Sequence, residues 1–244
     1  MMPPAVSAAS DVTPAPRIAD REPYASPSPP YPIDLWLNSN EGQAHPGPLL
    51  EELGESIPEL VRRYPSASRL EGLIAERTGL THERVLVTAG ADDAIYRACL
   101  VMLDRGRELI LPIPTFEMID RYARLAGGSV IEVDWLMGRY PTAAIMDAIT
   151  DRTAMIAVVS PNNPTGAIAR IEDLRQLSAA AARALLLIDL AYTEFADKDL
   201  TQAACELPNA LVTRTLSKAW GLAGLRVRSE ERRVGKECRA RGVP

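Results

Sequence analysis

Three groups of polar residues directly follow apolar, strand-like runs, and their chemistry is that of a covalent catalytic site. Asp189 ends the run ALLLID, where a carboxylate is costly to bury without a cationic partner. Lys218 follows the run ALVTRT, and a lysine desolvated among small and apolar residues becomes an amine nucleophile. Asn162 and Asn163 follow AMIAVVS in the loop PNNPTG, which leaves their amides as its hydrogen-bonding groups. Each group alone also fits an ordinary role: a capping aspartate, a solvated lysine and a plain turn.

A fourth group has the pattern of a phosphate site. The run RVLVT leads into TAGADD, where a glycine turn precedes small and acidic residues that open a helix. Exposed N–H groups at a helix N-terminus, aided by the helix dipole, suit a phosphate. The same pattern is explained by Asp92 as an N-cap and Gly90 as a turn residue. Arg226, eight residues after Lys218, could present its guanidinium to the same phosphate.

Together the four groups contain what is needed to hold pyridoxal phosphate. This cofactor requires a lysine for its Schiff base, a carboxylate that keeps the pyridine nitrogen protonated, and donors for its phosphate. Ligands of α/β proteins gather at the carboxyl ends of strands, where all four groups lie. Their joint occurrence therefore indicates a site for this cofactor, without a metal ion.

The apolar runs alternate with amphipathic stretches along the chain. The periodicity predicts strands at 84–88, 108–112, 129–133, 154–160, 184–189 and 210–215, and helices at 92–103, 115–125, 141–149 and 171–182. Strands that alternate with helices need crossover connections. The sequence therefore predicts an α/β fold of three layers, α/β/α, with a mainly parallel central sheet covered on both faces.

Composition and charge argue against several classes of protein. The formal net charge is −5 and no basic stripe with interleaved aromatic residues occurs, so no nucleic-acid partner is expected. Three widely spaced cysteines without a CxxC pair do not suit a disulfide scaffold or a zinc module. The two histidines, His45 and His82, leave little room for a metal centre or a Ser-His-Asp site. No run reaches the ~18 apolar residues of a membrane helix, so we expect a cytoplasmic protein without membrane contact.

Longer motifs surround the same residues. They are LWLNSNEG, RYPSA, VLVTAGADDAI, PIPTFEM, SPNNPTG, LIDLAYTEF and RTLSKAWGLAGLR. With these motifs the chain resembles the fold-type I aminotransferases, and within them the histidinol-phosphate aminotransferases, from residue 33 to about 227. SPNNPTG followed by D-x-A-Y and T-L-S-K-A is highly specific for the larger family, whereas LWLNSNEG and AGLR point to the histidinol-phosphate branch. The resemblance implies the major domain of a pyridoxal-phosphate-dependent transferase.

The resemblance also implies a role for each residue around the cofactor ring. Lys218 would form the Schiff base and shuttle a proton between the substrate and the cofactor. Asp189 would pair with the pyridinium nitrogen, and Tyr192 and Asn163 would hydrogen-bond the ring hydroxyl oxygen. Phe116 would stack on the ring.

A second set of residues is implied for the cofactor phosphate. The phosphate-binding site would be formed by backbone N–H groups and side chains of Ala91, Asp92, Thr215, Ser217 and Arg226. Tyr64, in RYPSA, would reach the phosphate of the neighbouring subunit, and the resemblance therefore implies a homodimer.

The chain is expected to divide into four parts. Residues 1–32, which hold nine of the 20 prolines, are predicted to be a largely disordered arm. An N-terminal segment at 33–60 and an incomplete cofactor-binding domain at 61–228 follow. Residues 229–244, SEERRVGKECRARGVP, interrupt the motif series in mid-domain; we interpret them as a spurious tail, the alternative being a solvated basic tail. The small C-terminal domain of the family, which carries the arginine that binds the substrate carboxylate, would then be missing from this sequence.

The function expected from the resemblance is amino-group transfer between L-histidinol phosphate and 2-oxoglutarate, in histidine biosynthesis. Its products are imidazole acetol phosphate and L-glutamate. A threonine-phosphate decarboxylase or an aromatic aminotransferase would share every cofactor residue named. An inactive truncated remnant is the alternative of another class.

Overall fold

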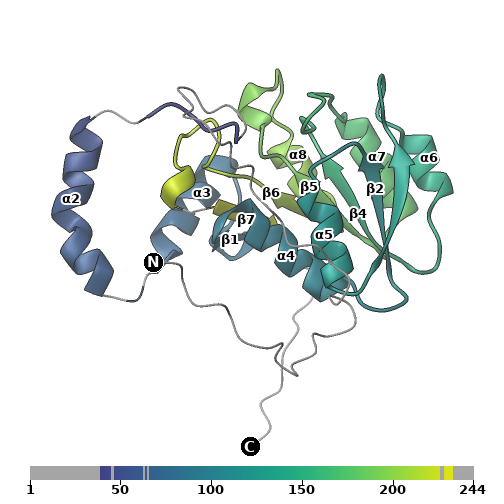
Figure 1. Cartoon of the computed structure of the whole chain (residues 1–244), viewed down its shortest axis with the longest axis horizontal. Coiled ribbons are helices and arrows are strands. Elements are labelled where there is room, and N and C mark those ends of the chain that lie inside the picture. Colours follow the sequence, from purple (N-terminus) through teal and green to yellow (C-terminus); the bar gives the residue numbers. More distant parts are fainter. Residues whose placement is uncertain (1–38, 45–46, 63, 65, 226–227, 233–244) are drawn as a thin grey trace, which may run out of the picture. The chain divides into compact units, whose positions relative to one another are not determined.

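The computed structural model of the chain describes residues 39–44, 47–62, 64, 66–225 and 228–232 (Figure 1). The predicted arm at 1–32, most of the predicted tail and Arg226 lie outside the described residues. Within the described ranges, no helix combines the length and the apolar composition needed to cross a membrane.

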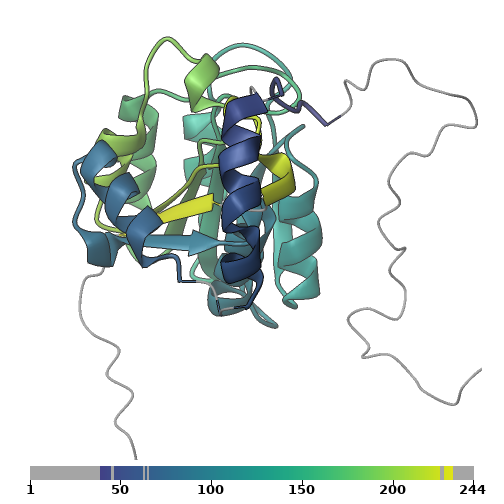
Figure 2. The same ribbon diagram turned by 90° about the vertical axis from the view of Figure 1, so that its left-hand side faces the viewer.

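A seven-stranded sheet lies at the centre, in the order β1-β7-β6-β5-β4-β2-β3. The strands are β1 (Val85–Thr88), β2 (Glu108–Ile113), β3 (Ser129–Asp134), β4 (Thr153–Val159), β5 (Leu185–Asp189), β6 (Ala210–Thr213) and β7 (Arg228–Arg232). The strands from β2 to β6 pair in parallel, and β7 runs antiparallel to both neighbours, β6 and β1. β1 therefore points the same way as β6, so six of the seven strands end at one edge of the sheet. Figure 2 views the sheet from the side on which β1 lies.

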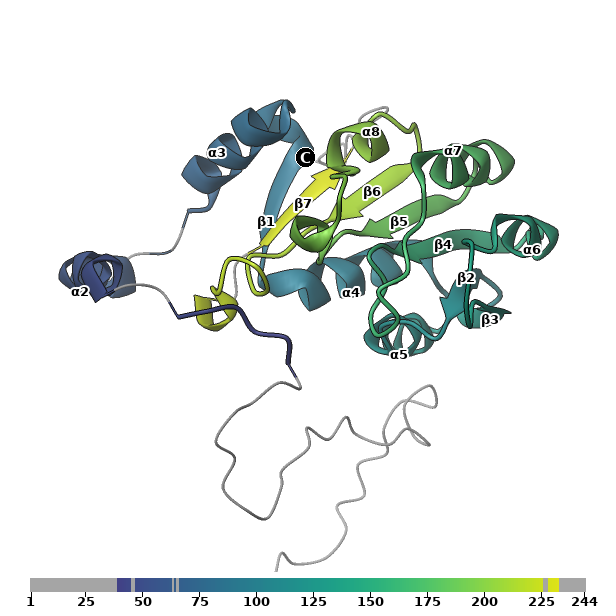
Figure 3. The same cartoon turned by 90° about the horizontal axis from the view of Figure 1, so that it is seen from above.

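Helices cover both faces of this sheet. The α-helices are α2 (Gly47–Arg62), α3 (Ser68–Thr78), α4 (Gly90–Met102), α5 (Met118–Leu125), α6 (Thr142–Asp147), α7 (Ile171–Ala180) and α8 (Thr201–Cys205). Short 3-10 turns are η1 (His82–Arg84), η2 (Thr193–Phe195) and η3 (Ala223–Leu225). Figure 3 shows α4 and α5 on one face, with α6, α7 and α8 on the other. The predicted three-layer α/β fold is confirmed.

Successive side chains of each strand point to opposite faces of the sheet, and this divides the core into two clusters, one on each face. In β2, Leu109 and Leu111 pack with helices α4 and α5, whereas Ile110 between them packs with α6 and α7. Residues of β4 and β5 alternate in the same way and are buried on both faces. These strands therefore appear in the sequence as continuous apolar runs, as expected for a parallel sheet covered on both sides.

One predicted boundary differs from the structure at the start of α5. A helix was expected from Thr115, but α5 begins at Met118. The Thr115 hydroxyl donates to Asn162 Oδ1 at 2.7 Å, so this residue belongs to the strand-end loop. A long-range side-chain bond of this kind leaves no trace in local periodicity.

The predicted break at residue 228 falls inside a strand. Residues 228–231 pair with β1, and residues 230–232 pair with β6. The first residues assigned to the tail are therefore part of the sheet in this structure. The prediction that 229–244 is foreign to the protein stays a prediction.

Leu174 gives a test of the core on the α7 face. It is fully buried, whereas Leu100 on α4 is 50% exposed. We expect Leu174→Ala to lower the free energy of unfolding by about 2–5 kcal/mol, because the substitution leaves a cavity. Leu100→Ala, the matched control, should cost less than about 1 kcal/mol. Urea denaturation measures both, and equal costs would contradict this packing.

Glu108 is a buried carboxylate that pairs with the largely exposed Arg152, at the end of the sheet opposite to the carboxyl ends of the parallel strands. It opens β2, is 4% exposed, and accepts hydrogen bonds from Thr150 Oγ1 at 2.5 Å and Arg152 Nε at 2.7 Å. The Thr150 hydrogen bond lowers the pKa of Glu108 below its ordinary value of 4.5; burial opposes this, and Arg152 adds to the lowering. The pKa of Glu108 is lower in the folded protein than in the unfolded chain. The ionised carboxylate therefore stabilises the fold at pH values above the pKa of the unfolded chain. This contribution is lost as the pH falls through the folded value.

Glu108→Gln tests that pH dependence. We expect the substitution to lower the free energy of unfolding at pH 7 and to reduce the further loss between about pH 5 and 3, because the titrating group has been removed. Urea denaturation across this range is the measurement, with the exposed Glu76→Gln as control. The same acid-induced loss in Glu108→Gln and the wild type would show that Glu108 does not contribute it.

Candidate active site

Asp189 is the buried end of β5 and is fixed by its neighbours. It is 3% exposed, pairs with Thr213 in the register of β5 and β6, and accepts a hydrogen bond from Thr213 Oγ1 at 2.9 Å. Its carbonyl accepts from Ser160 N at 2.9 Å, and Leu190 N donates to the Thr213 carbonyl at 2.8 Å. Contacts to β4 and β6 therefore hold this carboxylate at the carboxyl edge of the sheet.

Lys218 lies in a turn after β6 and faces a phenol. The turn is closed by the Gly221 N–H, which donates to the Lys218 carbonyl at 3.1 Å. Lys218 Nζ stands 5.9 Å from the ring centroid of Tyr192 and donates to the Ser39 carbonyl at 2.5 Å. The predicted nucleophile and the phenol three residues after Asp189 are thus brought together.

The two asparagines of the PNNPTG loop have different surroundings. Asn162 is 3% exposed; its Nδ2 donates to the Pro114 carbonyl at 2.8 Å and to Thr165 Oγ1 at 2.9 Å. These bonds tie the loop to the end of β2. Asn163 is half-buried and lines a pocket of about 600 Å³ together with Tyr192. Both asparagines line this pocket, but Asn162 also fixes the shape of the loop through its buried amide.

Helix α4 supplies the predicted phosphate position. It begins at Gly90, whose φ of +85° suits glycine, and its N-cap Ala89 provides no side-chain hydrogen bond. The alternative in which Asp92 is the N-cap is therefore wrong. Asp93 instead accepts from Ala89 N at 3.1 Å and from Arg97 Nε at 2.8 Å, and the Arg97 bond lowers the pKa of Asp93.

Ala91 and Asp92 lie in the first turn of α4, where N–H groups have no acceptor within the helix. These groups are the ones that the sequence assigns to a phosphate. At the end of β6, Thr215 and Ser217 are both buried, and Ser217 N donates to Thr215 Oγ1 at 3.1 Å. Hydroxyl groups are thus present on the loop that carries Lys218.

Of the predicted cofactor-binding residues, Asn163 and Tyr192 line the pocket of about 600 Å³, and the other described ones lie outside its lining. Phe116 is half-buried and packs against the cluster under α4 and α5. Tyr64, between α2 and α3, is fully exposed. Arg226 lies outside the described residues.

Sequence reasoning missed three residues that contact the predicted ones. Thr213 binds Asp189, and it could have been found from the register of adjacent parallel strands. Ser39 and Asn40 contact Lys218 and Tyr192, respectively. Asn40 is 152 positions from Tyr192, and no periodicity in the sequence relates the two.

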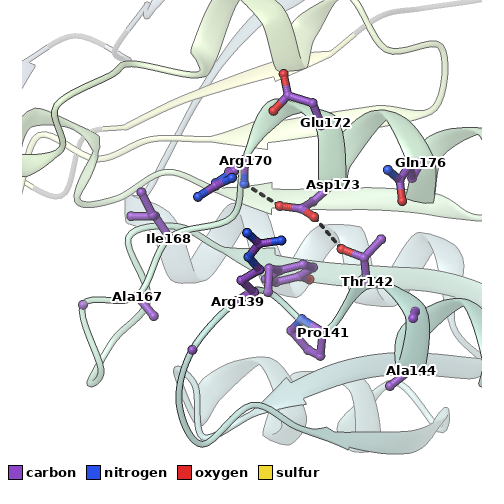
Figure 4. Close-up of a pocket in the computed structure, with 14 residues that line it drawn as sticks. Arg139, Pro141, Thr142, Ala144, Ala167, Ile168, Arg170, Glu172, Asp173 and Gln176 are labelled. Atoms are coloured by element: carbon purple, nitrogen blue, oxygen red, sulfur yellow. Dashed lines mark hydrogen bonds between the residues drawn. The ribbon is translucent and has the colours of Figure 1, made fainter.

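A second, larger pocket of about 1100 Å³ lies between α6 and α7. Figure 4 shows Asp173 at its wall, where the carboxylate accepts from Thr142 Oγ1 at 2.6 Å and from Arg170 N at 2.9 Å. Asp173 thus ties the starts of the two helices together. None of the predicted site residues lines this pocket.

The site offers an amine, a buried carboxylate, a phenol, an amide and a helix N-terminus at one edge of the sheet. In the described part of the chain, no three His, Cys, Asp or Glu residues are grouped so as to hold a metal ion. The set suits nucleophilic and proton-transfer chemistry on a ligand that carries an anionic group.

One family of known proteins matches most of the chain. Residues 46–227 match the family described as aminotransferase class I and II. A histidinol-phosphate aminotransferase of Methanosarcina barkeri is 33% identical over 197 residues, covering 79% of this chain and 54% of that protein. An aromatic amino acid aminotransferase of Mycobacteroides abscessus is 32% identical, covering 84% of this chain and 61% of that protein. The chain therefore spans somewhat more than half the length of these relatives.

Solved structures share the fold. The histidinol-phosphate aminotransferase of Sinorhizobium meliloti, in complex with pyridoxal-5'-phosphate, superposes with a TM-score of 0.72 at 21% identity, covering 80% of this chain and 55% of that one. An aspartate aminotransferase of Thermus thermophilus gives a TM-score of 0.68 at 25% identity, covering 79% and 57%. The fold is common to these proteins, and the family match extends over more than half of the sequence. The chain belongs to the class I and II aminotransferases.

Proposed function

We propose that this chain is the cofactor-binding part of a pyridoxal-phosphate-dependent aminotransferase that acts on L-histidinol phosphate and 2-oxoglutarate. The observation that carries the proposal is the approach of Lys218 to Tyr192, which follows the buried carboxylate of Asp189 by three residues. An amine, a phenol and a buried carboxylate on adjacent strand ends are the groups that this cofactor needs around its ring.

The residues present fit the cofactor at both of its ends. The first-turn N–H groups of α4 would bind the phosphate dianion, favoured by the helix dipole. Buried Asp189 would hold the ring nitrogen in its protonated form, since a carboxylate at 3% exposure is stabilised by a cationic partner. Tyr192 and Asn163 would border the ring oxygen.

When bound, pyridoxal phosphate supplies an electron sink for the electron pair of the substrate Cα–H bond. The Lys218 amine would accept the proton from the substrate Cα and return it to the cofactor. Tyr192 would donate its phenolic proton as a hydrogen bond to the ring oxygen. Asp189 would be held in place by the hydrogen bond from Thr213 Oγ1 and by the backbone bonds of its neighbours on β4 and β6.

Support for the substrate comes from the relatives. Histidinol-phosphate aminotransferases recur among those of about one-third identity. The aromatic amino acid aminotransferase of similar identity makes an aromatic amino donor the second candidate. The proposed homodimer would use Tyr64, whose full exposure leaves its side chain accessible to a partner subunit.

Lys218 is the first residue to test. The sequence has three lysines, Lys198, Lys218 and Lys236. We expect borohydride reduction after incubation with pyridoxal phosphate to fix the pyridoxyl group on Lys218, because its amine faces Tyr192, one of the predicted ring-binding groups. Peptide mapping by mass spectrometry reads the position. Labelling of Lys198 or Lys236 in its place would refute the site, and Lys218→Arg is the control that should abolish specific labelling.

Asp189→Asn tests the buried carboxylate. The substitution keeps the shape of the side chain but removes the charge that would hold a protonated ring nitrogen. We expect the Kd for pyridoxal phosphate to rise at least about tenfold, equivalent to about 1.4 kcal/mol, as measured by absorbance titration. Asp151→Asn, an exposed carboxylate before β4, is the matched control and should bind as the wild type does. Unchanged affinity in Asp189→Asn would contradict the assigned role.

A further inference from the structure

A short segment from the N-terminal side of the chain lies against the turn that carries Lys218. This segment, residues 39–44, is called the strap below. Figures 1 and 3 show it beside the 215–225 stretch. The Ser39 carbonyl accepts a hydrogen bond from Lys218 Nζ at 2.5 Å, and Asn40 Nδ2 donates to the Tyr192 hydroxyl at 3.0 Å. Two adjacent strap residues thus bind the two residues at the centre of the proposed site.

Gly42 explains how the strap can lie so close. A Cβ atom at this position would stand 2.2 Å from the Lys218 carbonyl oxygen and 2.7 Å from the Gly221 nitrogen. Both are backbone atoms of a hydrogen-bonded turn and cannot move aside as a flexible side chain would. Any other residue at position 42 therefore displaces the strap, the turn or both. The need for glycine here is one of space.

Asn40 has a conformation that suits its contact. Its φ is +51°, in the left-handed region that asparagine tolerates better than most side chains. A phenolic oxygen has one proton to donate and lone pairs that accept. Because Asn40 donates to this oxygen, the Tyr192 proton is directed elsewhere. In the proposed site it is free for the ring oxygen of the cofactor.

We infer that the strap is a positioning element, in which Gly42 allows the close approach and Asn40 acts through Tyr192 as a positioning residue. Asn40 orients the phenolic proton, and the Ser39 carbonyl holds the Lys218 amine before the cofactor arrives. The inference about Asn40 rests on the proposed function, whereas the seating of the strap does not.

The seating is tested without cofactor. Lys218 and the exposed Lys198 are acetylated in competition, and the ratio of their rates is read by peptide mass mapping. In Gly42→Ala we expect the Lys218 to Lys198 ratio to rise about fivefold, the factor that corresponds to loss of one hydrogen bond worth about 1 kcal/mol. Gly54→Ala is the control, because a Cβ there meets nothing within 4 Å. If both variants are folded, as judged by circular dichroism, and give equal ratios, the claim that Gly42 allows the strap to lie against the Lys218 turn is overturned.

The role of Asn40 is tested with pyridoxal phosphate bound. Asn40→Asp keeps a residue that tolerates φ of +51° but replaces the donor by an acceptor, which draws the phenolic proton away from the ring oxygen. An oxygen anion that loses a donor binds its proton more tightly. The pH midpoint of the bound cofactor's visible absorption should therefore move upward, in the same direction as in Tyr192→Phe.

The outcomes separate the two proposals. A shift in Tyr192→Phe with none in Asn40→Asp overturns the positioning role and leaves the proposed function standing. A wild-type chain that forms no cofactor band dependent on Lys218 overturns the proposed function, and the role of Asn40 with it. Should Gly42→Ala fail to fold, the acetylation ratio in Asn40→Asp decides the seating in its place. An unchanged ratio there would overturn it.

Discussion

A carboxylate buried at the end of a parallel strand is the constraint on which the rest of the site depends. Asp189 is 3% exposed, and its charge must be compensated where water is almost absent. Parallel pairing places Thr213 beside it and provides the first donor. The same pairing brings the loops after β4 and β6 to the same edge, so the amide of Asn163 and the amine of Lys218 follow from the sheet and not from local conformation.

The sheet itself was largely predictable, because a strand buried on both faces must be apolar along its whole length. The runs at β4, β5 and β6 therefore mark their strands and also the polar residues that end them. The start of α5 was not predictable, since Thr115 is removed from the helix by a bond to Asn162, 47 residues away. The start of α4 was predicted to within two residues, but its hydrogen bonds were not. The Asp93 carboxylate accepts a hydrogen bond from Ala89 N. The sequence does not indicate which of the two adjacent aspartates makes this bond.

The contacts of residues 39–44 show a further limit of sequence reasoning. Asn40 and Gly42 occur in a motif that points to a family, but the motif does not say what the two residues touch. Their partners, Tyr192 and the 218–221 turn, are far along the chain, and the relation is one of space and hydrogen-bond direction. Glycine at such a position is read from sequence as a flexible point. In this structure it is instead the place where two backbones come closest.

The position of β7 in the sheet affects the order in which the protein can fold during its synthesis. β1 has no strand partner in the described chain other than β7, which separates it from β6. When β1 leaves the ribosome, residues 228–232 have not yet been made, and only α3 and α4 can pack against it. The parallel strands from β2 to β6 can assemble in the order in which they emerge. β1 would therefore be joined to the sheet only once residues 228–232 have been made, whereas α4 can pack earlier on β2, β4 and β5 through Ile95 and Cys99.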